Sequence, residues 1–202
     1  MKVTPIRTRA VETHSCKLKE LLSESLTNIK PNSVIAITSK VVSLCEENVV
    51  PIKNSNKDKI IESEAEYFLP KNGNKYDVYL TIKNNMLVPS SGVDESNTNG
   101  YYVMWPKDPQ STANLCWQFI RNEFDITNVG VIITDSTSSP LRWGVTGKCI
   151  AYCGGNTRSC LTAVVLISTS SRQLRRRKSR NARSASRLAR SGSICEHARN
   201  AA

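Results

Sequence analysis

Apolar residues recur at helical spacing in three stretches of the chain, with charged and polar residues between them. These stretches, residues 15–29, 57–69 and 108–124, are predicted to form amphipathic helices. The third has the clearest start, because Asp108 suits the N-cap and Pro109 suits the first helical position. The positions expected to face the core in this helix are Leu115, Cys116, Phe119 and Ile120.

Runs of β-branched residues and alternating apolar positions mark the predicted strands. Residues 77–82 and 86–88 are expected to pair as a hairpin, with Asn84 and Asn85 forming the turn. The other predicted strands cover residues 3–6, 33–38, 101–105, 128–134, 148–152 and 161–167, of which 128–134 is the most convincing and 148–152 is its expected partner. This irregular order favours an α+β fold, with a mixed, largely antiparallel sheet and packed helices, over a doubly wound parallel sheet.

Positive charge is concentrated at the end of the chain. Residues 1–150 carry 17 Lys and Arg against 16 Asp and Glu, whereas residues 151–202 carry 11 against a single acid, Glu196. The last segment cannot bury enough apolar surface to offset its ordering entropy, so we expect disorder beyond about Ser170. We assign residues 1–154 to one folded domain and residues 155–202 to an irregular Arg/Ser-rich tail.

The tail leaves three interpretations open. The abrupt change of composition suggests the hypothesis that the residues after about Gly154 come from an out-of-frame read or a truncated gene, which would leave the chain inactive. A nucleic-acid-binding protein acting through the tail is an alternative; binding driven by charge alone would weaken steeply with salt. Stacking on bases is not expected, because the tail has no aromatic residue. An inactive structural remnant is the third interpretation.

The seven cysteines show no metal-binding spacing. No C-x-x-C pair occurs and the chain has only two histidines, so a zinc site is not expected. The N-terminus lacks the apolar region of a signal peptide, and no run of about 18 apolar residues could span a membrane. These features predict a cytoplasmic protein with reduced thiols, several of them in the core, and no membrane partner.

Two aspartates follow directly after apolar or glycine-containing segments. Asp94 lies in a loop rich in Ser, Asn and Gly, and Asp135 follows the apolar strand 128–134. A carboxylate at the exit of a buried strand is costly unless a cation pairs with it. Hard divalent cations bind carboxylate and hydroxyl oxygens, so the positions of Asp94 and Asp135 predict a metal site in a phosphate-handling enzyme. A turn or cap role is the alternative for each aspartate taken alone.

Two further segments carry groups that suit an anion. Ser39 and Lys40 follow the predicted strand at residues 33–38, where a hydroxyl and an ammonium group can meet a phosphate. The glycines of a Walker A loop are absent there. Arg142 lies beside Trp143, which suits binding of an anionic cofactor or substrate. A solvated lysine and a tryptophan that covers the core are the alternatives.

Five motifs occur together, in order and with natural spacing. They are residues 37–43 (ITSKVVS), 91–97 (SGVDESN), 105–109 (WPKDP), 129–136 (VGVIITDS) and 140–144 (PLRWG). At these residues the chain resembles the family of coenzyme F-420 γ-glutamyl ligases, and within it the CofE-like members of unassigned substrate. The resemblance covers residues 2–154. It implies a homodimer with an α+β fold.

The resemblance also implies a reaction and a set of site residues. L-glutamate would be joined through its amino group to an acidic acceptor by way of an acyl phosphate, with GTP and two Mn²⁺ or Mg²⁺ ions, and with K⁺ as a further candidate ion. By motif, Asp94, Asp135 and Ser136 would hold metal, and Ser39, Lys40 and Asn97 would contact the nucleotide.

Departures from the family pattern bear on the acceptor and on activity. Leu44 replaces a second nucleotide-binding lysine, and the sequence after Asp135 lacks the family's Phe-Gly-Arg-Pro-Trp pattern. Both favour an acceptor other than the deazaflavin cofactor itself. The family's glycine- and acid-containing region, which completes the nucleotide and second-metal site, is expected to be missing after Gly154.

Overall fold

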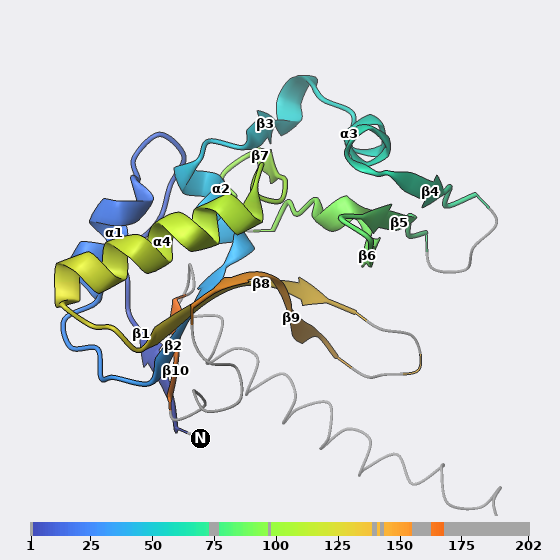
Figure 1. Ribbon diagram of the computed structural model, residues 1–202. Helices are drawn as coiled ribbons and strands as arrows, with labels where there is room; N and C mark the ends of the chain where they lie inside the picture. Colours follow the sequence, from blue (N-terminus) through green and yellow to red (C-terminus); the bar gives the residue numbers. More distant parts are fainter. Residues whose placement is uncertain are drawn as a thin grey trace, which may run out of the picture. The chain divides into compact units, whose positions relative to one another are not determined.

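A computed structural model describes residues 2–72, 77–96, 98–138, 141 and 144–154, and the backbone of residues 163–167 (Figure 1). The chain divides into two units, Met1–Thr169 and Ser170–Ala202. All of the described residues belong to the first unit, so the expected disorder of the tail lies outside them. No helix among the described residues is long and apolar enough to cross a membrane.

The largest sheet has five strands in the order β1-β10-β2-β8-β9. The first three pairings of this order are parallel, and β8 pairs with β9 in the antiparallel sense. The parallel pairings place the ends of β2 and β8 at the same edge of the sheet. The strands are β1 (Lys2–Ile6), β2 (Ser33–Thr38), β8 (Val129–Thr137), β9 (Thr146–Cys153) and β10 (Ala163–Ile167).

Helices α1 (Leu18–Ser25), α2 (Ser39–Cys45) and α4 (Pro109–Phe124) pack against one face of this sheet. Alternate residues of a strand point to the same face, so β8 presents Val131 and Ile133 to the helices. Both side chains are fully buried. The helices contribute apolar residues at helical spacing to the same core, among them Leu21, Leu22, Val41, Val42, Cys116 and Ile120.

A second region is built from shorter elements. Strand β3 (Val49–Pro51) pairs with β7 (Tyr101–Val103), and a three-stranded antiparallel sheet has the order β4-β5-β6. A small core holds this region together and contains Ile61, Tyr79, Val93, Tyr102 and Met104. Its other elements are η1 (Ile52–Asn54), α3 (Lys57–Glu64), β4 (Tyr67–Leu69), β5 (Leu80–Lys83), β6 (Met86–Pro89) and η2 (Ser90–Gly92).

One face of the three-stranded sheet is apolar and exposed. The register pairs Tyr67 with Ile82, Leu69 with Leu80 and Ile82 with Leu87, so these five side chains share a face. The exposed fractions of Tyr67 and Leu69 are 71% and 64%. We refer to this surface as the bare face, made of Tyr67, Leu69, Leu80, Ile82 and Leu87. A contiguous apolar surface of this kind is typical of an interaction site.

The α+β class predicted from the sequence is confirmed. The Asn84–Asn85 turn is confirmed as well, because both residues have positive φ, at 50° and 56°. The helix predicted from Asp108 is also confirmed, with the Asp108 side chain accepting a hydrogen bond from the Ser111 amide. The strands predicted at residues 128–134 and 148–152 pair as expected, and the strand predicted at 161–167 is found as β10.

Three details of the predicted helices are wrong. The helix predicted to reach residue 69 ends at Glu64, because Ala65 is extended and β4 then pairs with β5. The helix predicted from residue 15 to residue 29 is the shorter α1. Leu115, expected to face the core, is 52% exposed, since α4 turns Ala113, Cys116 and Ile120 inward instead.

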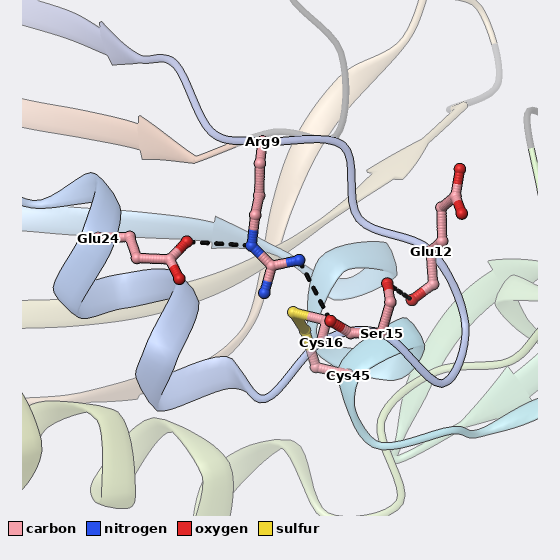
Figure 2. Close-up of a disulfide and its surroundings, with 6 residues drawn as sticks. All are labelled: Arg9, Glu12, Ser15, Cys16, Glu24 and Cys45. Atoms are coloured by element: carbon pink, nitrogen blue, oxygen red, sulfur yellow. Dashed lines mark hydrogen bonds and ion pairs between the residues drawn. A yellow bond between two sulfur atoms is a disulfide. The ribbon is translucent and has the colours of Figure 1, made fainter.

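A disulfide joins Cys16 to Cys45, the last residue of α2 (Figure 2). The expectation that the thiols are reduced is therefore wrong for these two residues. The loop before α1 is held near the bridge by Arg9, which donates to Glu24 on α1 and to the carbonyl oxygen of Ser15 (Figure 2). The α2 helix is thus tied at its last residue to the segment that precedes α1.

Candidate functional site

The candidate site starts where β2 passes directly into α2. Thr38 is the last residue of β2 and lies beside Thr134 of β8. Ser39 and Lys40 are the first two residues of α2, whereas β8 continues to Thr137. The parallel register therefore places the start of α2 next to the end of β8. Sequence reasoning identified Ser39 and Lys40 but not the helix that they begin.

Asp135 continues the core-facing row of β8, two residues after Ile133. Both of its carboxylate oxygens accept a hydrogen bond from another segment of the chain. Ser39 Oγ donates to Oδ1 at 2.7 Å, and Trp105 Nε1 donates to Oδ2 at 2.7 Å. Because each donor fixes one oxygen, the orientation of the partly buried carboxylate is determined by the fold.

Asp94 is bound by the residue that follows Ser39. Lys40 Nζ lies 2.5 Å from Asp94 Oδ2 and also donates to the carbonyl oxygen of Ser96 at 2.7 Å. The Ser96 amide donates to Asp94 Oδ1 at 2.8 Å, which is the Asx turn that the sequence offered as an alternative. Burial alone raises the pKa of Asp94, but the hydrogen bonds from Lys40 and Ser96 and the Lys40 charge outweigh it and lower the pKa below its ordinary value.

The backbone of the Asp94 loop is held on both sides. Asp94 N donates to Val103 O at 2.9 Å, and Val103 N donates to Asp94 O at 2.8 Å. Before Asp94 the chain turns sharply, with positive φ at Ser90, Ser91 and Gly92. Ser91 is fully buried there, and its hydroxyl donates to the carbonyl oxygen of Ile61 at 2.8 Å. The loop that carries Asp94 is consequently anchored to both β7 and α3.

Trp105 belongs to the site, although sequence reasoning placed it only in a motif and gave it no role. Its side chain is 2% exposed, and Lys83 Nζ lies 5.8 Å from the centre of its ring. Lys83 itself forms an ion pair with Glu64. A tryptophan next to a proline at the end of a short strand was the only signal for this residue, and it carries no information about which acid the indole would contact.

The remaining predicted residues have different outcomes. Ser136 follows Asp135 on β8, where it is exposed opposite Gly147 of β9. Asn97 and Arg142 lie outside the described residues, so their predicted roles stay predictions. A pocket lies against α2 but does not include the two aspartates; its lining is Val11, Glu12, Thr13, Leu44, Thr98, Asn99 and Tyr101.

The oxygen-rich donor set fits a hard divalent cation. Asp94 and Asp135 are held by consecutive residues of one helix, with the Ser39 and Ser96 hydroxyls beside them. No group of three or more His, Cys, Asp or Glu side chains that could hold a metal ion occurs in the described part of the chain. Mg²⁺ in phosphate-handling sites is usually held by one or two carboxylates plus substrate phosphates and water, so two carboxylates suffice for this kind of site.

Comparison with known proteins identifies the family of the chain. A family model described as F420-0:Gamma-glutamyl ligase matches residues 5–189. The chain belongs to this ligase family. The match extends beyond Gly154, the residue at which we expected the resemblance to end. The strand β10 lies within this added part and pairs with both β1 and β2.

The chain is similar to curated proteins that carry the name Coenzyme F420:L-glutamate ligase. The protein of Methanopyrus kandleri is 30% identical over 155 residues, that of Methanococcus maripaludis is 35% identical over 159 residues, and that of Methanocaldococcus jannaschii is 31% identical over 160 residues. Each match covers 68% of this chain and 60% of the relative. The chain thus spans about 60% of the length of the curated relatives that it matches.

Proposed function

We propose that this member of the family is a metal- and GTP-dependent ligase that joins L-glutamate, through its amino group, to an acidic acceptor. The proposal extends the names of the relatives, which cite L-glutamate, to this chain. GTP and Mn²⁺ or Mg²⁺ are the proposed cofactors, with K⁺ as a further ion. A cytoplasmic location is proposed as well, because GTP and free glutamate are both available there.

The proposed reaction has two steps that balance. A carboxylate oxygen of the acceptor takes the terminal phosphoryl group of GTP, which gives an acyl phosphate and GDP. The amino group of glutamate then attacks the acyl carbon, releases inorganic phosphate, forms an amide bond and loses a proton. Positioning and charge stabilisation supply most of the catalysis in phosphoryl transfer, so the residues of this chain are assigned to binding and orientation.

The proposal rests on the two residues at the start of α2, which each bind a different aspartate. Ser39 binds Asp135, and the next residue, Lys40, binds Asp94. Two acids that are 41 positions apart in the sequence are thereby joined through one helical turn. We assign Asp94, Asp135 and Ser136 to metal binding, where the cation would neutralise charge on the transferred phosphoryl group.

We assign nucleotide binding to Ser39, Lys40, Asn97 and Arg142. Lys40 supports this assignment most directly, because its side chain is 15% exposed and its ammonium group is already held within the site by Asp94 and Ser96. An ammonium group in this position can exchange one acidic partner for a phosphate oxygen. Ser39 has a hydroxyl at the same helix start.

The homodimer remains part of the proposal, and we place its interface on the bare face. The Tyr67–Ile82 and Leu69–Leu80 pairs present large apolar side chains to solvent, on the face opposite the buried Thr81 and Val88. A second copy of the chain would present the same apolar surface, which suits the self-complementary interface of a two-fold dimer.

The experiment that tests the proposed function is isothermal titration of the full chain with a non-hydrolysable GTP analogue, with and without Mn²⁺. We expect binding that requires Mn²⁺ and that is lost in Asp135→Ala. A parallel assay follows phosphate release with glutamate and candidate acidic acceptors. Nucleotide binding that is equally tight without metal and in Asp135→Ala would refute the proposal. A matched control is Asp125→Asn, which removes the charge of an acid at the C-cap of α4, where Asn tolerates the positive φ of 49°.

A further inference from the structure

One short segment of the chain fixes both aspartates. Val103, at the end of β7, exchanges two backbone hydrogen bonds with Asp94, at 2.9 and 2.8 Å. Two residues further on, the indole Nε1 of Trp105 donates to Asp135 Oδ2 at 2.7 Å. The segment from Val103 to Trp105 therefore contacts the backbone of Asp94 and the carboxylate of Asp135. No other described segment contacts both acids in this way except the start of α2.

The indole also packs directly against the loop that carries Asp94. Gly92 precedes Asp94 by two residues, and a Cβ atom built on it would lie 2.1 Å from Trp105 Nε1. This distance is far below van der Waals contact, so only glycine leaves room for the ring. Gly92 also has a φ of +72°, a backbone conformation that other residues rarely adopt. The ring thus acts as a spacer between the Asp94 loop and β8.

The remaining contacts of Trp105 involve its backbone and its ring. The carbonyl oxygen of Trp105 accepts a hydrogen bond from Asn48 Nδ2 at 2.6 Å, and Lys83 Nζ lies 5.8 Å from the ring centre. An indole N–H is a donor only, so Trp105 cannot itself bind a metal ion. It can orient the Asp135 carboxylate while leaving lone pairs on both oxygens free for a cation. Residues that act on a metal through its ligands commonly change its affinity.

We propose that Trp105 is a positioning residue that sets the spacing and orientation of Asp94 and Asp135 for a divalent cation. Gly92 is its necessary neighbour, because it admits the ring at the base of the Asp94 loop. The inference rests on the proposed metal-dependent function, and it adds a residue that contacts neither nucleotide nor metal in that proposal. It predicts that loss of the indole N–H weakens metal binding even when both aspartates are intact.

The test is Mn²⁺ affinity of the full chain, measured from the electron paramagnetic resonance signal of free Mn²⁺. We expect Trp105→Phe, which keeps a ring but removes the donor, to weaken Mn²⁺ binding by about 10- to 100-fold. The matched control is Trp117→Phe. Trp117 also donates its indole N–H at 2.9 Å, to the carbonyl oxygen of Val129, and also packs on a glycine, Gly154, but it contacts neither acid. The control should keep the wild-type affinity for Mn²⁺.

A second measurement on the wild-type protein keeps the inference testable if Trp105→Phe does not fold. The protein is labelled with 5-fluorotryptophan, and the fluorine resonances of Trp105 and Trp117 are followed during addition of Mn²⁺. The Trp105 resonance should broaden at the lowest Mn²⁺ concentrations, because the paramagnetic ion would lie beside its hydrogen-bonded acid. The Trp117 resonance should stay sharp.

The outcomes separate the two proposals. Folded Trp105→Phe that binds Mn²⁺ as tightly as wild type would overturn the positioning role and leave the proposed function standing. Equal broadening of both fluorine resonances would overturn it as well. Absence of Mn²⁺ binding in the wild-type protein would refute the proposed function, and the role of Trp105 with it.

Discussion

The five-stranded sheet and the three-stranded sheet use similar apolar residues in opposite ways. In the five-stranded sheet, Val131 and Ile133 on β8 are fully buried beneath helices α1, α2 and α4. In the three-stranded sheet, Tyr67 and Leu69 on β4 are mostly exposed. Apolar alternation along a strand therefore determines which residues share a face, whereas the neighbouring elements determine whether that face is buried. The candidate site lies between the two regions, because β8 supplies Asp135 and the loop after β6 supplies Asp94.

The two regions should also contribute differently to stability and to assembly. The five-stranded region carries its own core and should dominate the free energy of unfolding. The three-stranded region offers a surface that gains stability only when another surface covers it. Substitutions in the two regions should consequently affect different measurements.

The largest effect is expected for Leu22→Ala in α1. The Leu22 side chain is fully buried against the five-stranded sheet, so its removal should lower the free energy of unfolding by about 3.5 kcal/mol. Leu69→Ala on the bare face is the matched substitution, and at concentrations where the chain is monomeric it should change this free energy by less than about 0.5 kcal/mol. Chemical denaturation followed by circular dichroism measures both. Equal losses would show that the two regions share one core.

Reduction of the disulfide should have the next largest effect. The bridge closes a sequence separation of 29 residues between Cys16 and Cys45. Its loss should lower the free energy of unfolding by about 3 kcal/mol, through the added freedom of the unfolded chain. The double variant Cys16→Ser, Cys45→Ser should match the reduced wild type, and Cys149→Ser, which removes an exposed free thiol, serves as the control. A reductant that leaves the denaturation midpoint unchanged would contradict this expectation.

A smaller effect is expected from the ion pair that joins Lys40 to Asp94. The pKa of Asp94 is lowered in the folded protein, so the pair stabilises the fold fully above the ordinary carboxyl pKa of 3.8. This contribution is lost as the pH falls through the lowered pKa. Asp94→Asn should therefore be less stable than wild type near neutral pH, and the difference should shrink in acid.

Denaturation midpoints measured across this pH range, with a chelator present, provide the check. A difference between wild type and Asp94→Asn that stays constant down to the lowest pH would show that Asp94 does not titrate with a lowered pKa. Added salt should reduce the neutral-pH difference, since the Asp94 side chain is 45% exposed.

The smallest effect on stability, but a clear one on assembly, is expected on the bare face. Leu69→Ser combined with Leu87→Ser should leave the monomer's free energy of unfolding almost unchanged, because both side chains are largely exposed. The same variant should sediment as a monomer at concentrations where the wild type forms a dimer. Leu115→Ser, on an equally exposed leucine of α4, is the control and should remain dimeric. If the double variant is still a dimer, the dimer interface does not lie on the bare face.

The elements predicted correctly are those whose short-range sequence signals, such as caps and turns, match the structure that tertiary packing selects. Asp108 and Pro109 define the start of α4, and the Asn84–Asn85 pair defines the β5–β6 turn, because each signal acts over a few residues. The prediction failed for residues 65–69, where a helical pattern continued past the point at which β4 pairs with β5. Pairing between distant segments decided the structure there, and no short-range pattern reports it.

The residues of the site could be predicted from the sequence, but the contacts between them could not. Asp135 could be identified because four of the five residues before Thr134 are Val or Ile. That Ser39 would bind Asp135, and Lys40 would bind Asp94, depends on the parallel register of β2 and β8 and on the start of α2. The role of Trp105 depends on the same long-range arrangement. A sequence pattern gives the residue types of such a site, whereas the register gives their partners.

The most direct test of the account is a titration of Mn²⁺ into the wild-type chain, Asp94→Ala, Asp135→Ala and the double variant. If the two acids hold one ion, each single variant should lose most of the affinity, and the double variant should lose little more than either single variant. Wild-type affinity in both single variants would contradict a shared site. So would losses in the single variants that add independently in the double variant.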